Sequence, residues 1–192
     1  MDADQINAHI EPVIAKTLNW LDKVVIEQQF CPFARPVREK GQIHIAVQQH
    51  TDIASLLRQV LVECDYLLEQ RNIETSLLVY TEMLDDFNDY LDFVDLANDA
   101  IETAGLEGVL QLASFHPDYV FAGAPKDCAS NFTNRSPYPM IHIIQEQSIS
   151  DALESFKHAD AIPERNIAHA KALGIDFFLQ HLPTRSNANN KS

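Results

Sequence analysis

The chain has 192 residues, of which 46% are hydrophobic and 22% are charged, and its formal net charge is −14. This length suits one domain with its own hydrophobic core, and the composition is ordinary for a globular protein. The excess of acidic residues makes nucleic acid and anionic membranes unsuitable partners, because both carry negative charge.

Three further features of the sequence indicate a cytoplasmic protein. It contains no stretch of about 18 uncharged apolar residues, which a membrane-spanning helix would need. Its N-terminus begins with acidic residues and lacks the apolar segment of a signal peptide. Its three cysteines, Cys31, Cys64 and Cys128, are odd in number and widely spaced, which is typical of reduced thiols.

The first predicted element is an amphipathic helix within residues 6–26, where apolar side chains recur with a period of 3.6. Pro12 conflicts with this pattern, so we expect the ordered helix to begin near Glu11, with Pro12 in its first turn. The helix is expected to end before Cys31, because the residue preceding a proline avoids the helical conformation. Residues 31–36 (CPFARP) are expected to form an extended loop bounded by prolines.

Four strands are predicted, at residues 42–48, 75–81, 108–114 and 140–146. The first alternates apolar and polar residues, so its apolar residues Ile43, Ile45 and Val47 are expected to point inward. The second is apolar on both faces and is therefore expected at the centre of a sheet.

Helices are predicted around these strands. Amphipathic helices at residues 53–68 and 85–104 separate the first three strands, and the apolar stripe of the earlier one includes Cys64. Short helices are predicted after Ser148 and from Pro163 to Gly174, and residues 175–182 are expected to pack against the rest of the domain. No helix separates the last two strands.

The resulting order, α-β-α-β-α-β-β-α-α, predicts an α+β fold with a mixed four-stranded β-sheet packed with helices. The two strand–helix–strand units imply parallel crossovers, whereas the last two strands are expected to form an antiparallel pair. We expect a single globular domain over residues 1–182. Residues 183–192 contain no large apolar side chain, which predicts a disordered tail.

Between the third and fourth strands lies a long segment, Phe115 to Tyr138, with neither helical nor strand periodicity. Its two dozen or so residues far exceed the median loop of about 4–6 residues. Its aromatic residues argue against disorder, and its prolines lower the entropy lost when the loop is held in one shape. This composition predicts a rigid loop that carries a functional site.

Five motifs occur in order along nearly the whole chain: residues 31–34 (CPFA), 87–95 (FNDYLDFVD), 114–119 (SFHPDY), 134–139 (NRSPYP, followed by His142) and 162–166 (IPERN). In these motifs the chain resembles an uncharacterised bacterial family called domain of unknown function 1415. The resemblance implies a single-domain bacterial protein. It implies no particular reaction.

Cys31 is the first candidate catalytic residue. Arg35 and Arg38 follow it closely, and basic neighbours lower the pKa of a thiol and favour the nucleophilic thiolate. Paired with a histidine, Cys31 could act as a nucleophile. The alternative is a buried structural cysteine within a rigid turn.

Two histidines, His116 and His142, are the candidate acid–base residues. His116 follows the third strand at its C-terminal end, where open α/β sheets bind their ligands. His142 lies on the fourth strand, on the same predicted face as Met140, Ile144 and Glu146. With Asp118 or Glu146 the two histidines could ligate a metal, but no metal-binding spacing supports this, and we predict neither a metal nor a cofactor.

The distribution of charge favours an anionic small molecule as the ligand. Residues 30–41 carry three basic residues and one acidic residue, and residues 115–138 carry two of each, which leaves −16 for the rest of the chain. Arg35 and Arg135 are therefore the candidate anion-binding residues, because a guanidinium fits carboxylates and phosphates. Concentration of acidic residues on solvated helix faces would explain the same distribution, and Arg135 could instead hold its own loop.

The other residues assigned to substrate binding are Asp118, Asn134 and Tyr138, all in the long loop. Nucleotide-binding and hydrolase motifs are absent from the sequence. The favoured hypothesis is an enzyme acting on a small carboxylate or phosphate at a site built from residues 31–38 and 115–142. The alternative is a non-catalytic module that binds a ligand or a protein partner.

Overall fold

The computed structural model describes residues 3–154 and 159–182, so the tail predicted at residues 183–192 lies outside the described chain. Within these ranges the elements are, in order, α1 (Ala3–Trp20), the π-helical segment η1 (Leu21–Ile26), α2 (Ala34–Glu39), β1 (Ile43–Gln48), α3 (Ile53–Glu69), β2 (Thr75–Tyr80), α4 (Phe87–Thr103), β3 (Leu110–Phe115), the 3₁₀ helix η2 (Ala129–Thr133), β4 (Met140–Gln145), α5 (Glu146–Glu154), the 3₁₀ turn η3 (Ala159–Ala161), α6 (Ile162–Leu173) and α7 (Ile175–Leu179). The predicted α+β fold is confirmed.

The four strands form one mixed sheet in the order β1-β2-β4-β3. β1 and β2 are parallel, as the helix between them requires, and β4 is antiparallel to both of its neighbours. His142 in β4 is therefore flanked by Leu77 of β2 on one side and by Ala113 of β3 on the other. The predicted mixed sheet and the antiparallel pairing of its last two strands are both confirmed.

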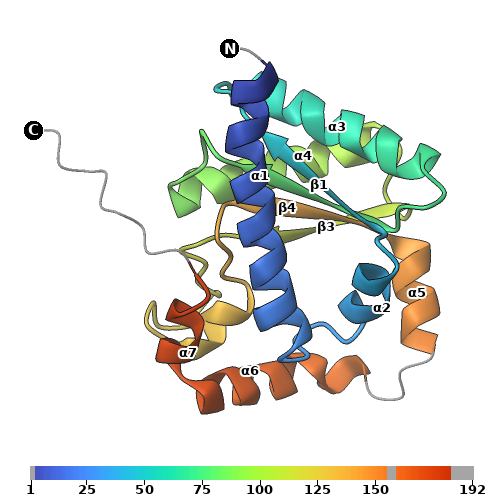
Figure 1. The fold of residues 1–192 in the computed structure, drawn as a ribbon. Helices are drawn as coiled ribbons and strands as arrows, with labels where there is room; N and C mark the ends of the chain where they lie inside the picture. Colours follow the sequence, from blue (N-terminus) through green and yellow to red (C-terminus); the bar gives the residue numbers. More distant parts are fainter. Residues whose placement is uncertain (1–2, 155–158, 183–192) are drawn as a thin grey trace, which may run out of the picture.

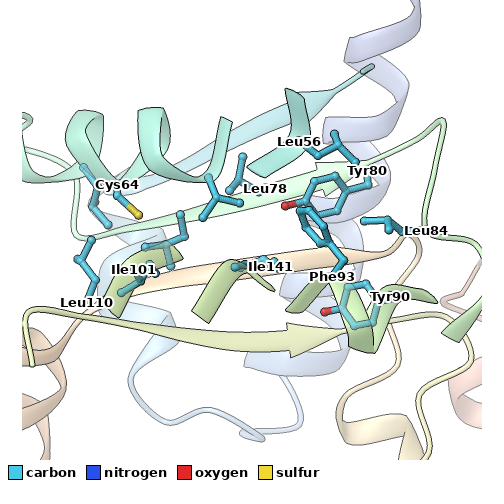
Figure 2. Packing of buried hydrophobic residues seen from close by; sticks show 14 residues of the cluster. Leu56, Cys64, Leu78, Tyr80, Leu84, Tyr90, Phe93, Ile101, Leu110 and Ile141 are labelled. Atoms are coloured by element: carbon cyan, nitrogen blue, oxygen red, sulfur yellow. The ribbon is translucent and has the colours of Figure 1, made fainter. Parts of the chain in front are cut away.

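Helices α3 and α4 cover one face of the sheet (Figure 1). Figure 2 shows how side chains from both helices meet Leu78 and Tyr80 of β2 and Ile141 of β4. The Tyr80 and Phe93 rings pack edge to face with centroids 5.4 Å apart. We call this cluster the α3–α4 core. Cys64 is fully buried in it, as its position on the apolar helix stripe predicts.

The opposite face of the sheet packs against α1, η1, α6 and α7. Trp20 and Val24 from the first helical stretch and Phe178 from α7 are buried there with Leu77 and Met140 from the strands. We call this second cluster the α1 core. In Figure 1, α1 crosses in front of the sheet. Helices α2 and α5 lie beside one another at the lower right of the sheet.

Two predictions about the N-terminal third are wrong. The first helix begins at Ala3 and continues through Pro12, instead of beginning near Glu11. Pro12 and Ala8 are both exposed, so the carbonyl of Ala8, which loses its hydrogen bond at the proline, can bind water instead. Part of the expected extended loop forms α2, where Pro36 lies in the first turn and its missing N–H breaks no helical hydrogen bond.

The helix starts that the sequence indicates are present. The side chain of Asp52 accepts a hydrogen bond from the backbone N–H of Ser55 at the start of α3. Asp86 caps α4 in the same way through Asn88 and Asp89. Within the part of the chain described, no helix is both long and apolar enough to cross a lipid bilayer.

Candidate functional site

A cavity of about 570 Å³ lies on the α1 side of the sheet, between the strands and helices α1, α2 and α5. Alternation along the strands supplies its floor, because Ala113, Phe115, His142 and Ile144 point to the same face. The walls are mainly apolar and come from the three helices and their adjoining turns: Trp20, Leu21, Val25, Pro32, Phe33, Ala34, Pro36, Val37, Ile149 and Ala152.

Six of the lining residues have a side chain with a hydrogen-bonding or titratable group: Trp20, Cys31, Glu74, Thr75, His142 and Ser148. The indole N–H of Trp20 already donates to the carbonyl of Arg135 at 2.9 Å. Glu74 is the only member of the described lining with a formal charge at neutral pH. Its carboxylate already accepts hydrogen bonds from Ser148 Oγ at 2.7 Å and from Gln42 Nε2 at 3.5 Å. Most of the lining can therefore contact only apolar groups of a ligand.

His142 and Thr75 form a hydrogen-bonded pair in the floor of the cavity. Thr75 Oγ1 donates to the carbonyl of Ile143 at 2.7 Å and lies 2.5 Å from Nε2 of His142. The His142 ring is partly accessible from the cavity but surrounded by protein atoms. Burial lowers the pKa of His142 from its ordinary value of 6.5 to about 4, because the cationic ring would lose hydration. At neutral pH the ring is therefore uncharged.

Cys31 lines the same cavity, but its predicted thiolate is not favoured. Burial is the largest influence and raises the pKa of the Cys31 thiol, although the backbone N–H groups of Phe33 and Ala34 oppose this effect. The arginines expected to lower the pKa are engaged elsewhere. Arg38 forms two hydrogen bonds with Asp22 at 3.0 and 3.1 Å, and Arg35 contacts the carbonyl of Ile26. The predicted lowering of the pKa of Cys31 is therefore wrong in direction.

His116 lies on the other side of the sheet from the cavity. It is fully buried, and its ring packs against Phe87 and Tyr90 of the α3–α4 core. Nε2 lies 3.0 Å from the carbonyl of Leu84, and Nδ1 accepts the backbone N–H of Asp118 at 3.0 Å. Both ring nitrogens thus bind backbone groups, which holds the start of the long loop against α4.

The long loop is held by hydrogen bonds from its own side chains. Arg135 donates from Nε to the carbonyl of Tyr119 at 3.1 Å and from Nη2 to the carbonyl of Lys126 at 2.7 Å. Its guanidinium lies over the Phe132 ring, 4.4 Å from the centroid. Burial lowers the pKa of Arg135 from its ordinary value, and the negative charge of Asp118 opposes this effect. This geometry corresponds to the alternative in which Arg135 holds its own loop.

The remaining predicted binding residues also lie outside the described lining. Asn134 Nδ2 donates to the carbonyl of Ser114, and the backbone carbonyl of Asn134 accepts the N–H of His116. Tyr138 packs against the α1 core, and its carbonyl accepts the hydroxyl of Ser136. Of the eight predicted site residues, the cavity brings together Cys31 and His142. Arg35, His116, Asp118, Asn134, Arg135 and Tyr138 are placed elsewhere.

Sequence reasoning missed Thr75, Glu74, Trp20 and Ser148 as cavity residues. For Thr75 a signal existed, because it begins a strand otherwise composed of Ser76 and apolar residues. The pairing of β2 with β4, which brings Thr75 to His142, joins strands that are far apart in the sequence. No cluster of three metal-ligating side chains occurs within the described residues. Glu146, a possible ligand on the sequence evidence, begins α5 instead of continuing β4.

Comparison with protein-family models gives one match, described as "Protein of unknown function (DUF1415)", over residues 12–180. No curated protein and no solved structure matches the chain. The match covers every element from the middle of α1 to the end of α7, including the whole described lining of the cavity.

Proposed function

We propose that this chain, which belongs to the DUF1415 family of proteins of unknown function, binds a small and mainly apolar molecule in the cavity beside α1, α2 and α5. The observation that carries this proposal is an apolar cavity of about 570 Å³ with the uncharged His142 in its floor. Ligand sites commonly measure roughly 300–1,000 Å³ and combine apolar walls with a few polar groups.

An occupant also accounts for the cavity in energetic terms. Protein interiors are close-packed, and voids much larger than a water molecule are few because each one forfeits dispersion contacts. On the same sheet the apolar side chains of Leu78, Ile141 and Ile143 are completely buried. A ligand that fills the cavity would make dispersion contacts with its apolar walls and, because it binds only the folded chain, would stabilise the fold.

A screen of small apolar molecules by thermal shift tests the proposal. The substitution Ala113→Met extends a side chain into the cavity beside His142, so it should remove the stabilisation that ligands give the native chain. Ala172→Met is the matched control, because Ala172 is exposed on α6 and lies outside the cavity lining. Equal stabilisation of both variants, or of neither the variants nor the native protein, would contradict binding in this cavity.

A second candidate function is catalysis, favoured by the presence of Cys31 and His142 in the lining of one cavity. In such a reaction Cys31 Sγ would attack the carbonyl carbon of an ester or thioester while the thiol proton passed to His142. The bond from that carbon to the alcohol or thiol would then break, the leaving group would take the proton from His142, and water would hydrolyse the acyl-enzyme. The raised pKa of the thiol and the lowered pKa of the imidazole oppose a resting ion pair, so we rank binding above catalysis. A screen with small esters and thioesters, repeated on Cys31→Ser, tests this candidate.

An anionic substrate, expected from the charge distribution, has weaker support than an apolar ligand. It would need a cation, and neither Arg35 nor Arg135 contributes to the described lining. We place the binding function in the cytoplasm, on the support of three free cysteines that need a reducing environment to remain thiols.

A further inference from the structure

We propose that the ligand of this cavity carries an uncharged hydrogen-bond donor, such as a hydroxyl group, on an apolar body, and that Thr75 sets this preference by fixing the tautomer of His142. This inference deepens the proposed binding function and rests on it. It also replaces the anionic ligand expected from the sequence with a neutral one.

The hydroxyl group of Thr75 has a single proton, and the geometry decides where that proton points. The carbonyl oxygen of Ile143 can only accept, and it lies 2.7 Å from Thr75 Oγ1, so the hydroxyl must donate to it. If the proton pointed at His142 instead, two oxygen lone pairs would face each other at that short distance. Thr75 Oγ1 therefore accepts from His142, 2.5 Å away.

Nε2 of His142 must then carry the ring proton. A neutral imidazole has only one N–H, so Nδ1 is left as a lone-pair acceptor. No side chain or backbone group in the described part of the chain is found to donate to Nδ1. Because the ring lines the cavity, a ligand that brings a donor can complete its hydrogen bonding.

Charged ligands fit this arrangement poorly. A carboxylate has no proton to donate to Nδ1, and it would bring a second negative charge into a cavity whose wall includes Glu74. A protonated amine can donate, but its charge would be desolvated by apolar walls, and the Glu74 carboxylate is already bound by Ser148 and Gln42. A neutral phenol or alcohol can donate to Nδ1 of His142 without repulsion from Glu74 and without the desolvation of a charged group.

Four probes of similar size separate these classes: 4-ethylphenol, ethylbenzene, 4-ethylbenzoate and 4-ethylbenzylamine. Their affinities for the full chain can be measured by isothermal titration calorimetry at pH 7. We expect 4-ethylphenol to bind about tenfold more tightly than ethylbenzene, which is the scale of one net hydrogen bond. Both charged probes should bind more weakly than ethylbenzene. Tighter binding of either charged probe than of the phenol would overturn the proposal.

Three variants test the role of each residue. His142→Phe should abolish the advantage of the phenol while ethylbenzene affinity stays within about twofold. Thr75→Val should reduce the advantage, because it removes the acceptor that holds the proton on Nε2, whereas Thr75→Ser should retain it. The ¹⁵N chemical shifts of the two His142 ring nitrogens report the tautomer directly. A proton on Nδ1 in the native chain would overturn the assignment.

The outcomes separate this inference from the binding function on which it rests. If ethylbenzene and the phenol both bind but with equal affinity, the binding function stands and the donor preference is wrong. If none of the four probes binds and no other apolar molecule stabilises the chain, both are wrong.

Discussion

The hydroxyl of Thr75 and the imidazole of His142 lie 2.5 Å apart in the floor of an apolar cavity, although 67 positions separate them in the sequence. Strand β4 brings His142 beside Leu77 in the antiparallel pair β2–β4, and Thr75 is opposite Ile144, two residues from His142. Because the pair is formed by two central strands, its geometry is fixed by the backbone of the sheet.

The burial of His142 should make stability depend on pH. The pKa of His142 is about 4 in the folded chain and near its ordinary 6.5 in the unfolded chain, so the unfolded state binds more protons between these values. Stability should therefore fall as pH decreases from about 6.5 to about 4, by at most about 3 kcal/mol.

Denaturant titrations across this pH range check the prediction when the native chain is compared with His142→Phe. The variant should lack the decrease between pH 6.5 and pH 4 that His142 contributes. His9→Gln, at an exposed position of α1, is the control substitution. Parallel curves for the native chain and His142→Phe would contradict a buried neutral imidazole.

The three thiols should react with iodoacetamide in the order Cys128, Cys31, Cys64. Hydrogen bonding from the Ser130 side chain is the largest cause that lowers the pKa of Cys128. Burial raises the pKa of Cys31, and it raises the pKa of Cys64 to about 12. Cys31, whose pKa its basic neighbours in the sequence were expected to lower, is therefore not the first thiol in this order.

Mass spectrometry of the native chain, alkylated at several pH values, measures the three rates separately. Ser130→Ala should slow the alkylation of Cys128 at neutral pH and leave Cys31 unchanged. If Cys31 were labelled fastest, the loop around it would have to increase the reactivity of its thiol despite the burial of the side chain.

Arg135→Ala and Arg135→Lys should both destabilise the chain. Alanine removes two hydrogen bonds to loop carbonyls and the contact with the Phe132 ring, which we expect to lower the free energy of unfolding by about 1–3 kcal/mol. Lysine keeps the charge but cannot reach both carbonyls from a planar group, so an intermediate loss is expected.

Thermal unfolding of both variants gives the size of these losses, with Arg58→Ala as a control at an exposed position of α3. Ligand affinity in the cavity should stay the same, since Arg135 does not line it. A large loss of ligand affinity in a variant of unchanged stability would instead support a ligand-binding role for Arg135.

His116→Phe should reduce stability without affecting ligand binding. The ring nitrogens bind the carbonyl of Leu84 and the N–H of Asp118 in a fully buried position, so their removal eliminates both of these hydrogen bonds. Each hydrogen bond lost contributes about 0.5–1.5 kcal/mol to stability. Equilibrium denaturation measures the stability loss, and titration with 4-ethylphenol measures binding. His142→Phe should instead lower the affinity for 4-ethylphenol more than it lowers stability. Similar losses of phenol affinity in His116→Phe and His142→Phe would contradict the assignment of these two histidines to different roles.

The sequence alone determined the order of the four strands and of the helices around them except α2, the mixed sheet and the antiparallel pair β3–β4, because hydrophobic periodicity and connection lengths are local properties. It also determined which residues of β4 share a face: Met140 and Ile144 lie on the same side as His142. The one exception is Glu146, which begins α5 instead of extending the strand.

Only the tertiary structure decided which groups meet on each face. Periodicity shows that His142 shares a face with its neighbours in the strand, but it contains no information on which helices cover that face. The pairing of β2 with β4 joins strands about 65 residues apart and places Thr75 against His142. The turn after β3 directs His116 to the α3–α4 core, and the loop carbonyls engage Arg135. These contacts arise from the path of the whole chain. The sequence could therefore give the loop-holding role of Arg135 only as one of two alternatives, and it did not place Thr75 against His142.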